Sequence, residues 1–503
     1  MGADERQAPG VSVRAVRAFI RARGRAPAGL ADRYVSVFGA IMLVAVLGQP
    51  LSSALSGLAG PVEAGRMGAG AALVSLACAG GLAMARAVGP VMVSGADASW
   101  LLLSPLHRRH LLGRTGRSLA VVAVLVGLLV GVGMLAVLGA PDQLVWRLLG
   151  VLAVGVSASV AGMALAMLSQ ASQVWHVWLT CAVAALLVLA LVAVSGQART
   201  VLAAASAAPL PALAAFASAT AASAALLMRR AWTSLATIPA RVLLTASTRA
   251  GHVATAAVLV DPGVLTWIAE DNHWRARKLT SRRWPRLPAP FAPAWQDWLR
   301  LVRRPGRLAA VFGCAALPAV FVQAGGGPVA LGAALLAGSV AVAATCTSGA
   351  RRDSDNPALA RLAGVGHRQA LAARALLPAL VSGAWAALAL AGVALVGGLG
   401  SWTWVWFGPL AAPALAAAAL RMARRSPVDH SMPVIDTPGG AIPTGPLFWA
   451  VKGVDLALIG CLPTVMALAS SPAEPGAFLA AQAVLGLATL TGFLLTARPR
   501  ATT

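Results

Sequence analysis

Long apolar stretches recur along this chain, and each is about as long as a helix that crosses a lipid bilayer. Such a helix needs about 20 mostly apolar residues. We identify twelve of these stretches, six in each half of the sequence: 34–58, 68–94, 119–138, 148–168, 179–195, 201–228, 308–324, 328–348, 375–396, 402–420, 447–469 and 476–497. The pattern predicts an all-α polytopic membrane protein with about twelve transmembrane helices.

The composition agrees with this prediction and excludes two other classes. Hydrophobic residues make up 58% of the chain and charged residues 11%, whereas about a quarter of a soluble domain is charged. A soluble globular enzyme and a disordered chain are both excluded. Stretch 201–228 is the least regular, because Pro209 and Pro211 lie within it. We expect a short extracellular or re-entrant helix there, followed by a span that begins near Pro211.

The net charge of +24 is distributed unevenly between the loops. If the N-terminus is cytoplasmic and the stretches alternate in direction, the inside segments hold 35 basic residues and the outside loops three. Lys and Arg collect on the cytoplasmic side of membrane proteins. We therefore predict a plasma-membrane protein with both termini in the cytoplasm and no nucleic-acid partner. One inside loop, 169–178, contains no Lys or Arg.

A short motif, His-Arg-x-x-Leu-x-x-Arg, occurs in both halves of the chain, at residues 107–114 and 367–374. The inside loop that precedes each copy opens with Ser-Gly-Ala, at Ser94 and Ser348. Since each half has six stretches, the repeats have the same orientation in the membrane. We predict two parallel six-helix repeats.

The repeat and the charge pattern divide the chain into five segments. They are a basic N-terminal interfacial helix (1–33), the first six-span half (34–228), a basic cytoplasmic linker with an interfacial helix (229–307), the second six-span half (308–497) and a cytoplasmic tail (498–503).

An amphipathic helix is predicted before each half. In the first, Arg14, Arg17 and Arg21 lie beside an apolar face, and in the second Trp295 and Trp298 share a face three residues apart. A helix of this kind lies at the membrane interface, with its apolar face among the lipid chains. We expect membrane lipid to contact these residues. The alternative is an ordinary charge cluster that only fixes the topology.

Catalytic motifs are missing from the sequence. A P-loop needs Gly-Lys followed by Ser or Thr, and neither Lys278 nor Lys452 has these neighbours. No two of the five cysteines have CxxC spacing. Among the seven histidines, His107 and His110 are three residues apart, but the arginines beside them disfavour a metal ion. We therefore expect no catalytic residue, no metal site and no cofactor bound by this chain, which would not be an enzyme.

Three ionisable residues fall within the apolar stretches, where charge is costly and often functional. They are Arg86, Lys452 and Asp455. Lys452 and Asp455 are three residues apart and would pair on one helix face, and Arg86 would reach the interface. These three residues have either this structural role or a role in transport, and the sequence leaves both alternatives open. Asp455 is the only acidic residue within a stretch, which argues against proton or sodium coupling.

The two repeated inside loops, 95–118 and 349–374, are candidate docking points for an energy-supplying partner. In each loop, a group of apolar residues is followed by arginines at the start of the next predicted helix. A helix that presents leucine and arginine side chains can fit a groove on another protein. The alternative is that both loops only fix the topology through their positive charge.

Residues 101–112 read Leu-Leu-Leu-Ser-Pro-Leu-His-Arg-Arg-His-Leu-Leu and resemble the coupling loop of ABC-2-type exporter permeases. The copy at 355–371 lacks the Ser-Pro pair. Residues 428–443 are similar to a stretch of actinobacterial permease-like proteins with two fused halves. The resemblance implies these coupling-loop candidates: Pro105, Leu106, His107, Arg108, Arg109, Arg114, His367, Arg368 and Arg374.

The resemblance also implies a function and a partner. It implies a permease driven by a separate ABC ATP-binding subunit in two copies, with ATP and Mg bound on that subunit. It implies export, and the apolar spans favour an apolar or amphipathic substrate. Two alternatives remain: a twelve-span secondary transporter, and a non-transporting membrane scaffold or assembly protein.

Overall fold

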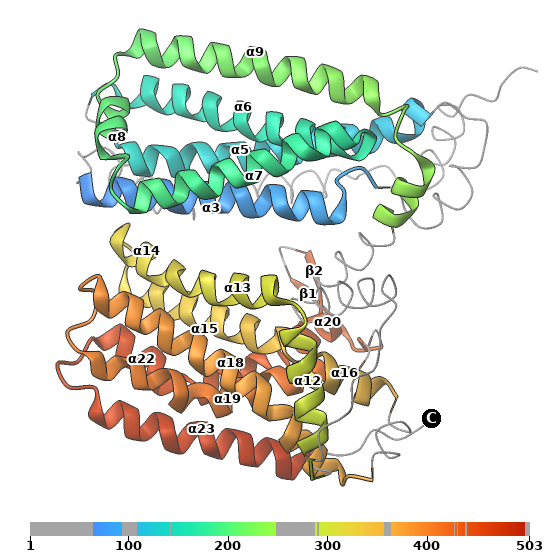
Figure 1. The fold of residues 1–503 in the computed structure, drawn as a ribbon, viewed down its shortest axis with the longest axis vertical. Helices are drawn as coiled ribbons and strands as arrows, with labels where there is room; N and C mark the ends of the chain where they lie inside the picture. Colours follow the sequence, from blue (N-terminus) through green and yellow to red (C-terminus); the bar gives the residue numbers. More distant parts are fainter. Residues whose placement is uncertain are drawn as a thin grey trace, which may run out of the picture. The chain divides into compact units, whose positions relative to one another are not determined.

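The computed structural model describes residues 64–92, 108–140, 142–247, 287–288, 291–356, 364–426, 428–429, 431–437 and 440–497 (Figure 1). Contacts divide the chain into two compact units, residues 59–432 with 444–503, and residues 1–58 with 433–443. All the described helices belong to the larger unit. The predicted span 34–58 and the interfacial residues Arg14, Arg17 and Arg21 lie outside the described residues.

Five long helices and one short helix form the described part of the first half, in the predicted order (Figure 1). They are α3 (Ala64–Val88), α5 (Arg108–Leu138), α6 (Leu144–Ala171), α7 (Gln173–Val194), α8 (Arg199–Ser206) and α9 (Leu210–Ser234). Helix α6 packs between α5 and α9, and α3 packs on α7. The break between α8 and α9 falls at Pro209, so the prediction of a short helix followed by a span is confirmed.

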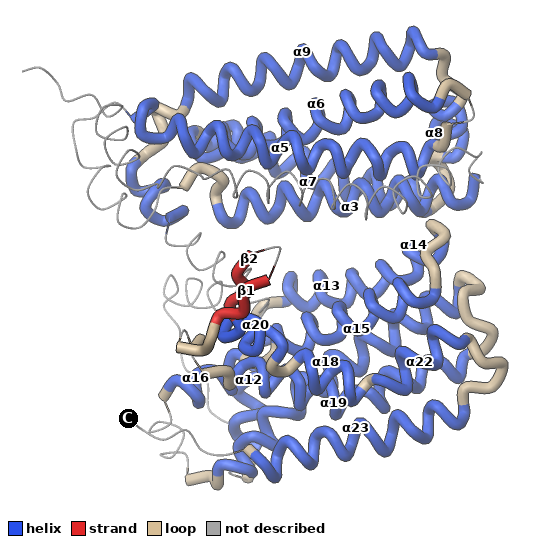
Figure 2. The backbone as a smooth tube through the Cα atoms, turned by 180° about the vertical axis from the view of Figure 1, so that it is seen from behind, coloured by secondary structure: helices blue, strands red, loops and turns tan. Residues whose placement is uncertain are grey.

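The second half consists of spanning helices and several shorter ones (Figure 2). They are α12 (Ala292–Val302), α13 (Pro305–Gly313), η2 (Cys314–Ala316), α14 (Leu317–Gln323), α15 (Pro328–Thr345), α16 (Ser348–Asp355), α18 (His367–Leu395), η3 (Trp402–Trp406), α19 (Phe407–Ala423), α20 (Thr444–Val451), α21 (Val454–Gly460), α22 (Leu462–Ser470) and α23 (Gly476–Thr496). Helix α19 packs between α18 and α23, with Phe407 and Leu415 fully buried.

Ten helices among the described residues are long and apolar enough to cross a membrane. The protein is therefore an all-α polytopic membrane protein, as predicted. Helix α5 has an exposed apolar face. Its residues Val121, Leu125 and Leu129 lie four residues apart, and their side chains are 57–73% exposed. A stripe of exposed aliphatic side chains at this spacing faces lipid chains in a spanning helix.

The predicted span 447–469 is not one helix but three, α20, α21 and α22. The chain turns at Gly453, which has a φ of 96°. A Cβ at this position would overlap Met422 of α19, so the break depends on glycine. The expectation of a continuous helix was wrong because hydropathy measures the length of an apolar stretch and does not detect turns within it.

Glycines bring the third and fourth spans of each half into close contact. In the first half, Gly127 and Gly131 of α5 face Gly155 of α6, and a Cβ at Gly155 would lie 2.5 Å from the Gly131 nitrogen. In the second half, Gly383 of α18 faces Gly408 of α19 in the same way. Small residues let membrane helices approach through their backbones. Close backbone packing at glycine therefore occurs at both crossings.

A two-stranded antiparallel hairpin is the one addition to the expected architecture in the described part of the chain. Strand β1 (Val434–Thr437) pairs with β2 (Gly440–Pro443), and Ile435 lies opposite Ile442. We did not expect strands within an all-α protein. The hairpin lies in the stretch 428–443 that carries part of the sequence resemblance, just before α20.

Candidate functional site

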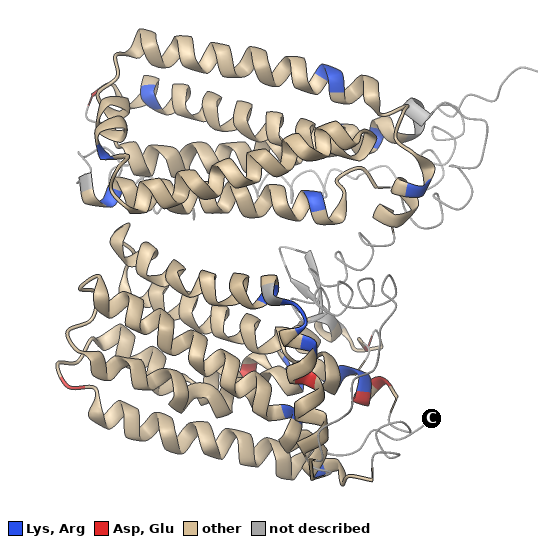
Figure 3. Ribbon diagram, in the orientation of Figure 1, with Lys and Arg blue, Asp and Glu red and all other residues tan. Residues whose placement is uncertain are grey.

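Most charged residues of the second half lie at one end of its helices, near α12 and α16 (Figure 3). Helix α12 forms where the sequence predicted an amphipathic helix. Its exposed face carries Trp298 and Val302, while Asp297 and Leu301 are buried against the protein. Trp295 is half-buried. The apolar outer face fits a helix at the membrane interface, and the buried face carries a carboxylate.

Arg374 of α18 is the centre of a buried ion cluster that joins three helices. Its side chain is 6% exposed, and Nη1 lies 2.7 Å from Oδ1 of Asp297 in α12. Asp353 of α16 receives two hydrogen bonds, from Nε at 2.9 Å and from Nη2 at 3.1 Å. Arg374 also donates to the Pro293 carbonyl and to Oε1 of Gln296. We refer to Arg374, Asp297, Asp353, Gln296 and Pro293 as the Arg374 cluster.

Burial raises the pKa of the Asp297 carboxyl, because the buried site disfavours its charged form. The guanidinium of Arg374 opposes this effect, and Arg300, whose Nη1 lies 3.6 Å from Asp297, also opposes it. A buried carboxylate is tolerated only with such partners. The Arg374 cluster therefore depends on all of its charges being present.

The repeated Ser-Gly-Ala triplet has a structural role in the second half. Ser348, Gly349 and Ala350 form the first turn of α16, and all three are buried. A Cβ at Gly349 would overlap both the Asp297 carboxylate and the Arg374 guanidinium. Glycine at this position therefore leaves the space in which the ion pair forms.

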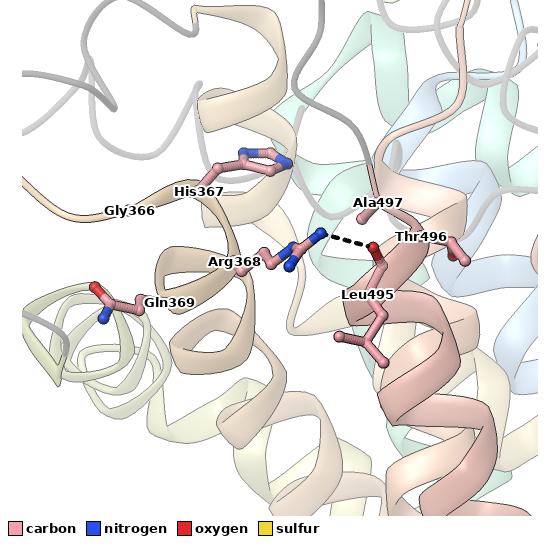
Figure 4. A pocket seen from close by; sticks show the side chains of 7 residues that line it. All are labelled: Gly366, His367, Arg368, Gln369, Leu495, Thr496 and Ala497. Carbon is pink, nitrogen blue, oxygen red and sulfur yellow. Dashed lines mark hydrogen bonds between the residues drawn. The ribbon is translucent and has the colours of Figure 1, made fainter.

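His367 and Arg368, the first two residues of α18, line a pocket of about 570 Å³ (Figure 4). Arg368 is exposed, and its Nη2 donates to the Leu495 carbonyl at 3.1 Å, near the end of α23. His367 is half-buried beside Arg424, with 3.3 Å between Nε2 and Nη2. These residues lie at the surface, whereas Arg374 is buried and does not reach an outside partner directly.

The first-half counterparts are described only in part. Arg108 and Arg109 begin α5, as His367 and Arg368 begin α18. Arg114, the counterpart of Arg374, is exposed. Pro105, Leu106 and His107 lie outside the described residues.

Asp455 does not pair with Lys452, and that expectation was wrong. The Asp455 carboxylate accepts hydrogen bonds from the backbone nitrogens of Gly453 and Leu456, and Oδ2 lies 3.1 Å from Nη2 of Arg421. The turn at Gly453 ends α20 and separates the two residues. The i, i+3 geometry on which the prediction rested is therefore absent.

Gln482 is a buried polar residue that a search for ionisable groups could not detect. It is fully buried in α23, and its Oε1 accepts from the Thr464 nitrogen and hydroxyl while Nε2 donates to the Gly460 carbonyl. These partners flank the break between α21 and α22. Gln482 therefore satisfies backbone groups that the break leaves without helical partners. A lone Gln in an apolar stretch is the available sequence signal.

Arg86 lies near the end of α3 and its Nε donates to Nε2 of His176 in α7 at 3.2 Å. It lines a second basic pocket in the first half. Among the residues that the structure describes, no group of three His, Cys, Asp or Glu side chains is placed to hold a metal ion.

Comparison with known proteins gives one match. The model of a family of unknown function, DUF6297, matches residues 62–433. The match covers helices of both halves, the linker between them and every residue of the Arg374 cluster. No curated protein and no solved structure matches the chain.

Proposed function

The chain belongs to the DUF6297 family, whose function is unknown, and we propose that it is the transmembrane permease subunit of an ABC-2-type transporter. In this proposal both halves form the translocation pathway in the plasma membrane. A separate ABC ATP-binding subunit, in two copies, binds ATP and Mg. The exported substrate is apolar or amphipathic.

The observation that carries the proposal is the Arg374 cluster. It fixes α12 and α16 to α18 through a buried cation and two carboxylates. Helix α16 belongs to the loop that resembles a coupling loop, and α18 is a candidate spanning helix. A displacement of α16 by a partner would therefore move α18, because breaking the buried pair costs about 3–5 kcal/mol.

The surface residues beside the cluster support a partner on this side of the protein. Arg368 and Gln369 are exposed at the start of α18, and His367 borders the same pocket (Figure 4). The sequence contains no P-loop lysine, so an ATP-driven mechanism needs a second chain. Spans with few charges suit the passage of an apolar or amphipathic substrate.

The proposal is tested by co-expressing the tagged chain with a candidate ABC ATPase and measuring the amount of ATPase retained on affinity purification. The Arg108→Glu/Arg368→Glu variant should retain at least about tenfold less, because each reversal adds repulsion at the docking surface. Arg199→Glu, at the start of α8, is the matched control and should retain the wild-type amount.

Equal retention by wild type and by Arg108→Glu/Arg368→Glu would show that these loops do not dock an ATPase. Reconstitution then separates the remaining functions. Transport driven by a proton gradient in ATP-free vesicles would favour a secondary transporter. A complex that forms with the ATPase but moves no substrate would favour a scaffold or assembly protein.

A further inference from the structure

A basic pocket of about 340 Å³ lies where α3 ends and α7 begins, and residues 239–246 at the start of the predicted linker also line it. Three separate elements supply its cations and its histidine. Arg86 comes from α3, His176 from the first turn of α7, and Arg241 from the helical segment 240–247. These residues are far apart in sequence, so the fold brings them together.

Among the residues that the structure describes, no carboxylate faces the arginines of the basic pocket. The residues that line it include no Asp or Glu. Arg86 donates a hydrogen bond from Nε to Nε2 of His176. Within the described part of the chain, neither Arg86 nor Arg241 forms a salt bridge. By contrast, Arg147 and Arg374 each lie against a carboxylate.

Backbone and amide groups complete the wall of the basic pocket. Gln170 near the end of α6 accepts from the Val91 nitrogen at 2.9 Å and donates to the Val91 carbonyl at 3.4 Å, which holds the segment after α3 in place. Ser172 and Gln173, at the start of α7, also line the pocket. The first turn of a 22-residue helix carries unpaired N–H groups and a partial positive charge.

We propose that the basic pocket binds a phosphate group. Two guanidinium groups beside a helix N-terminus, with no carboxylate among the lining residues, suit the charge and the hydrogen-bond acceptors of a phosphate. The phosphate belongs either to an anionic lipid headgroup or to a soluble phosphate compound. The site does not depend on the proposed ATPase partner.

The site also accounts for an exception in the charge pattern. The loop 169–178 has no Lys or Arg of its own, although alternation of the spans assigns it to the cytoplasmic side. Arg86 and Arg241 border this loop in the folded protein. The positive charge expected at the anionic leaflet is therefore supplied from other elements.

The test measures binding by the purified full chain in a neutral detergent, using the thermal shift reported by tryptophan fluorescence. Three probes are compared: short-chain phosphatidylglycerol, phosphatidylcholine of the same chain length, and sodium phosphate against sodium chloride at equal ionic strength. Wild type should be stabilised by phosphatidylglycerol or by inorganic phosphate. A response to phosphatidylglycerol alone identifies a lipid headgroup, and a response to inorganic phosphate identifies a soluble compound.

The Arg86→Gln/Arg241→Gln variant should bind its probe at least about tenfold more weakly, because hydrogen bonds to charged groups are lost. Arg117→Gln is the matched control. Arg117 is exposed on α5 and bonds to the Gly113 carbonyl of its own helix, outside the basic pocket. Its loss should leave binding unchanged.

Arg241→Gln alone controls for misfolding, because Arg241 is exposed and forms no salt bridge within the described part of the chain. It should weaken binding by several-fold with an unchanged melting temperature in the absence of probe. The proposal is overturned if neither probe stabilises wild type, or if Arg241→Gln and the double variant bind as tightly as Arg117→Gln.

Discussion

At the scale of single residues, the chemistry of this protein is concentrated in a few buried polar side chains within a mostly apolar chain. Arg374 was found in the sequence because it belongs to a repeated motif. Its partner Asp297 was not found, because the two residues are far apart in sequence and become neighbours only when α12 packs on α18. The predictions for single residues therefore concern polar side chains that meet their partners only in the folded protein.

Replacing Arg374 should destabilise the second half more than replacing any exposed arginine of α18. Arg374→Gln leaves the buried Asp297 without its main partner, and such a loss costs about 3–5 kcal/mol. The measurement is the thermal unfolding of the purified protein, together with protease cleavage between α12 and α13. Arg368→Gln, on the same helix but exposed, is the control and should change stability by about 1 kcal/mol or less.

Asp297 should give the protein a pH-dependent stability of defined sign. A raised pKa means that the folded protein holds the proton more tightly than the unfolded chain does. The stability contributed by this group is therefore present below the ordinary carboxyl pKa of about 3.9. It is lost as the pH rises through the raised pKa of folded Asp297.

Melting temperatures of wild type and Asp297→Asn, measured across that pH range in one detergent, test this prediction. The difference, wild type minus variant, should fall as the pH rises, since the amide does not titrate. A constant difference, or one that grows with pH, would contradict the raised pKa of Asp297.

Gln482→Leu should destabilise the protein by about 1–3 kcal/mol, because the Gly460 carbonyl and the Thr464 nitrogen lose their partner inside the membrane. The fraction of monodisperse protein after heating in detergent is the readout. Gln197→Leu, in the loop before α8, is an exposed control. If both variants behave alike, Gln482 does not support the broken span.

At the scale of elements, helix contacts are set by glycines at two equivalent crossings. Hydropathy predicted most of the helices, because a long apolar stretch has few other folds available in a membrane. It did not predict the interruption of 447–469, since the turn depends on a single glycine that approaches α19. The turn at Gly453 therefore becomes evident only from the contact between this segment and α19.

Gly155→Leu should separate α5 from α6, because its side chain would overlap the backbone of Gly131. We expect a loss of at least about 1–3 kcal/mol, typical of overpacking. Thermal unfolding and the yield of folded protein are the measurements. Gly81→Leu in α3 is the matched control, since a Cβ at Gly81 meets no atom within 4 Å. Equal losses in the two variants would mean that this crossing is not tightly packed.

At the scale of the whole molecule, the charge distribution predicts an orientation that reporter fusions can test. We expect green fluorescent protein fused after Thr503 to fluoresce, because the C-terminus is predicted to be cytoplasmic. Alkaline phosphatase fused after Gln197 should be active, because that loop is predicted to lie outside. An inactive phosphatase fusion beside a fluorescent C-terminal fusion would mean that one of the intervening stretches is wrongly counted.

The fold class followed from the sequence, since apolar length and positive-inside charge are properties of single segments. The candidate site followed only in part. The repeated motif located α18 and its surface residues His367 and Arg368, while the Arg374 cluster and the basic pocket needed three-dimensional packing. Asp297 is an ordinary polar residue of an amphipathic helix until α18 covers it.

Asp297 also bears on why two halves are joined in one chain. Residues 13–21, the amphipathic stretch predicted before the first span, contain no Asp or Glu. Two identical subunits encoded by one gene would carry the carboxylate twice or not at all. A single chain with two halves has no such constraint and can place a buried ion pair in its second half.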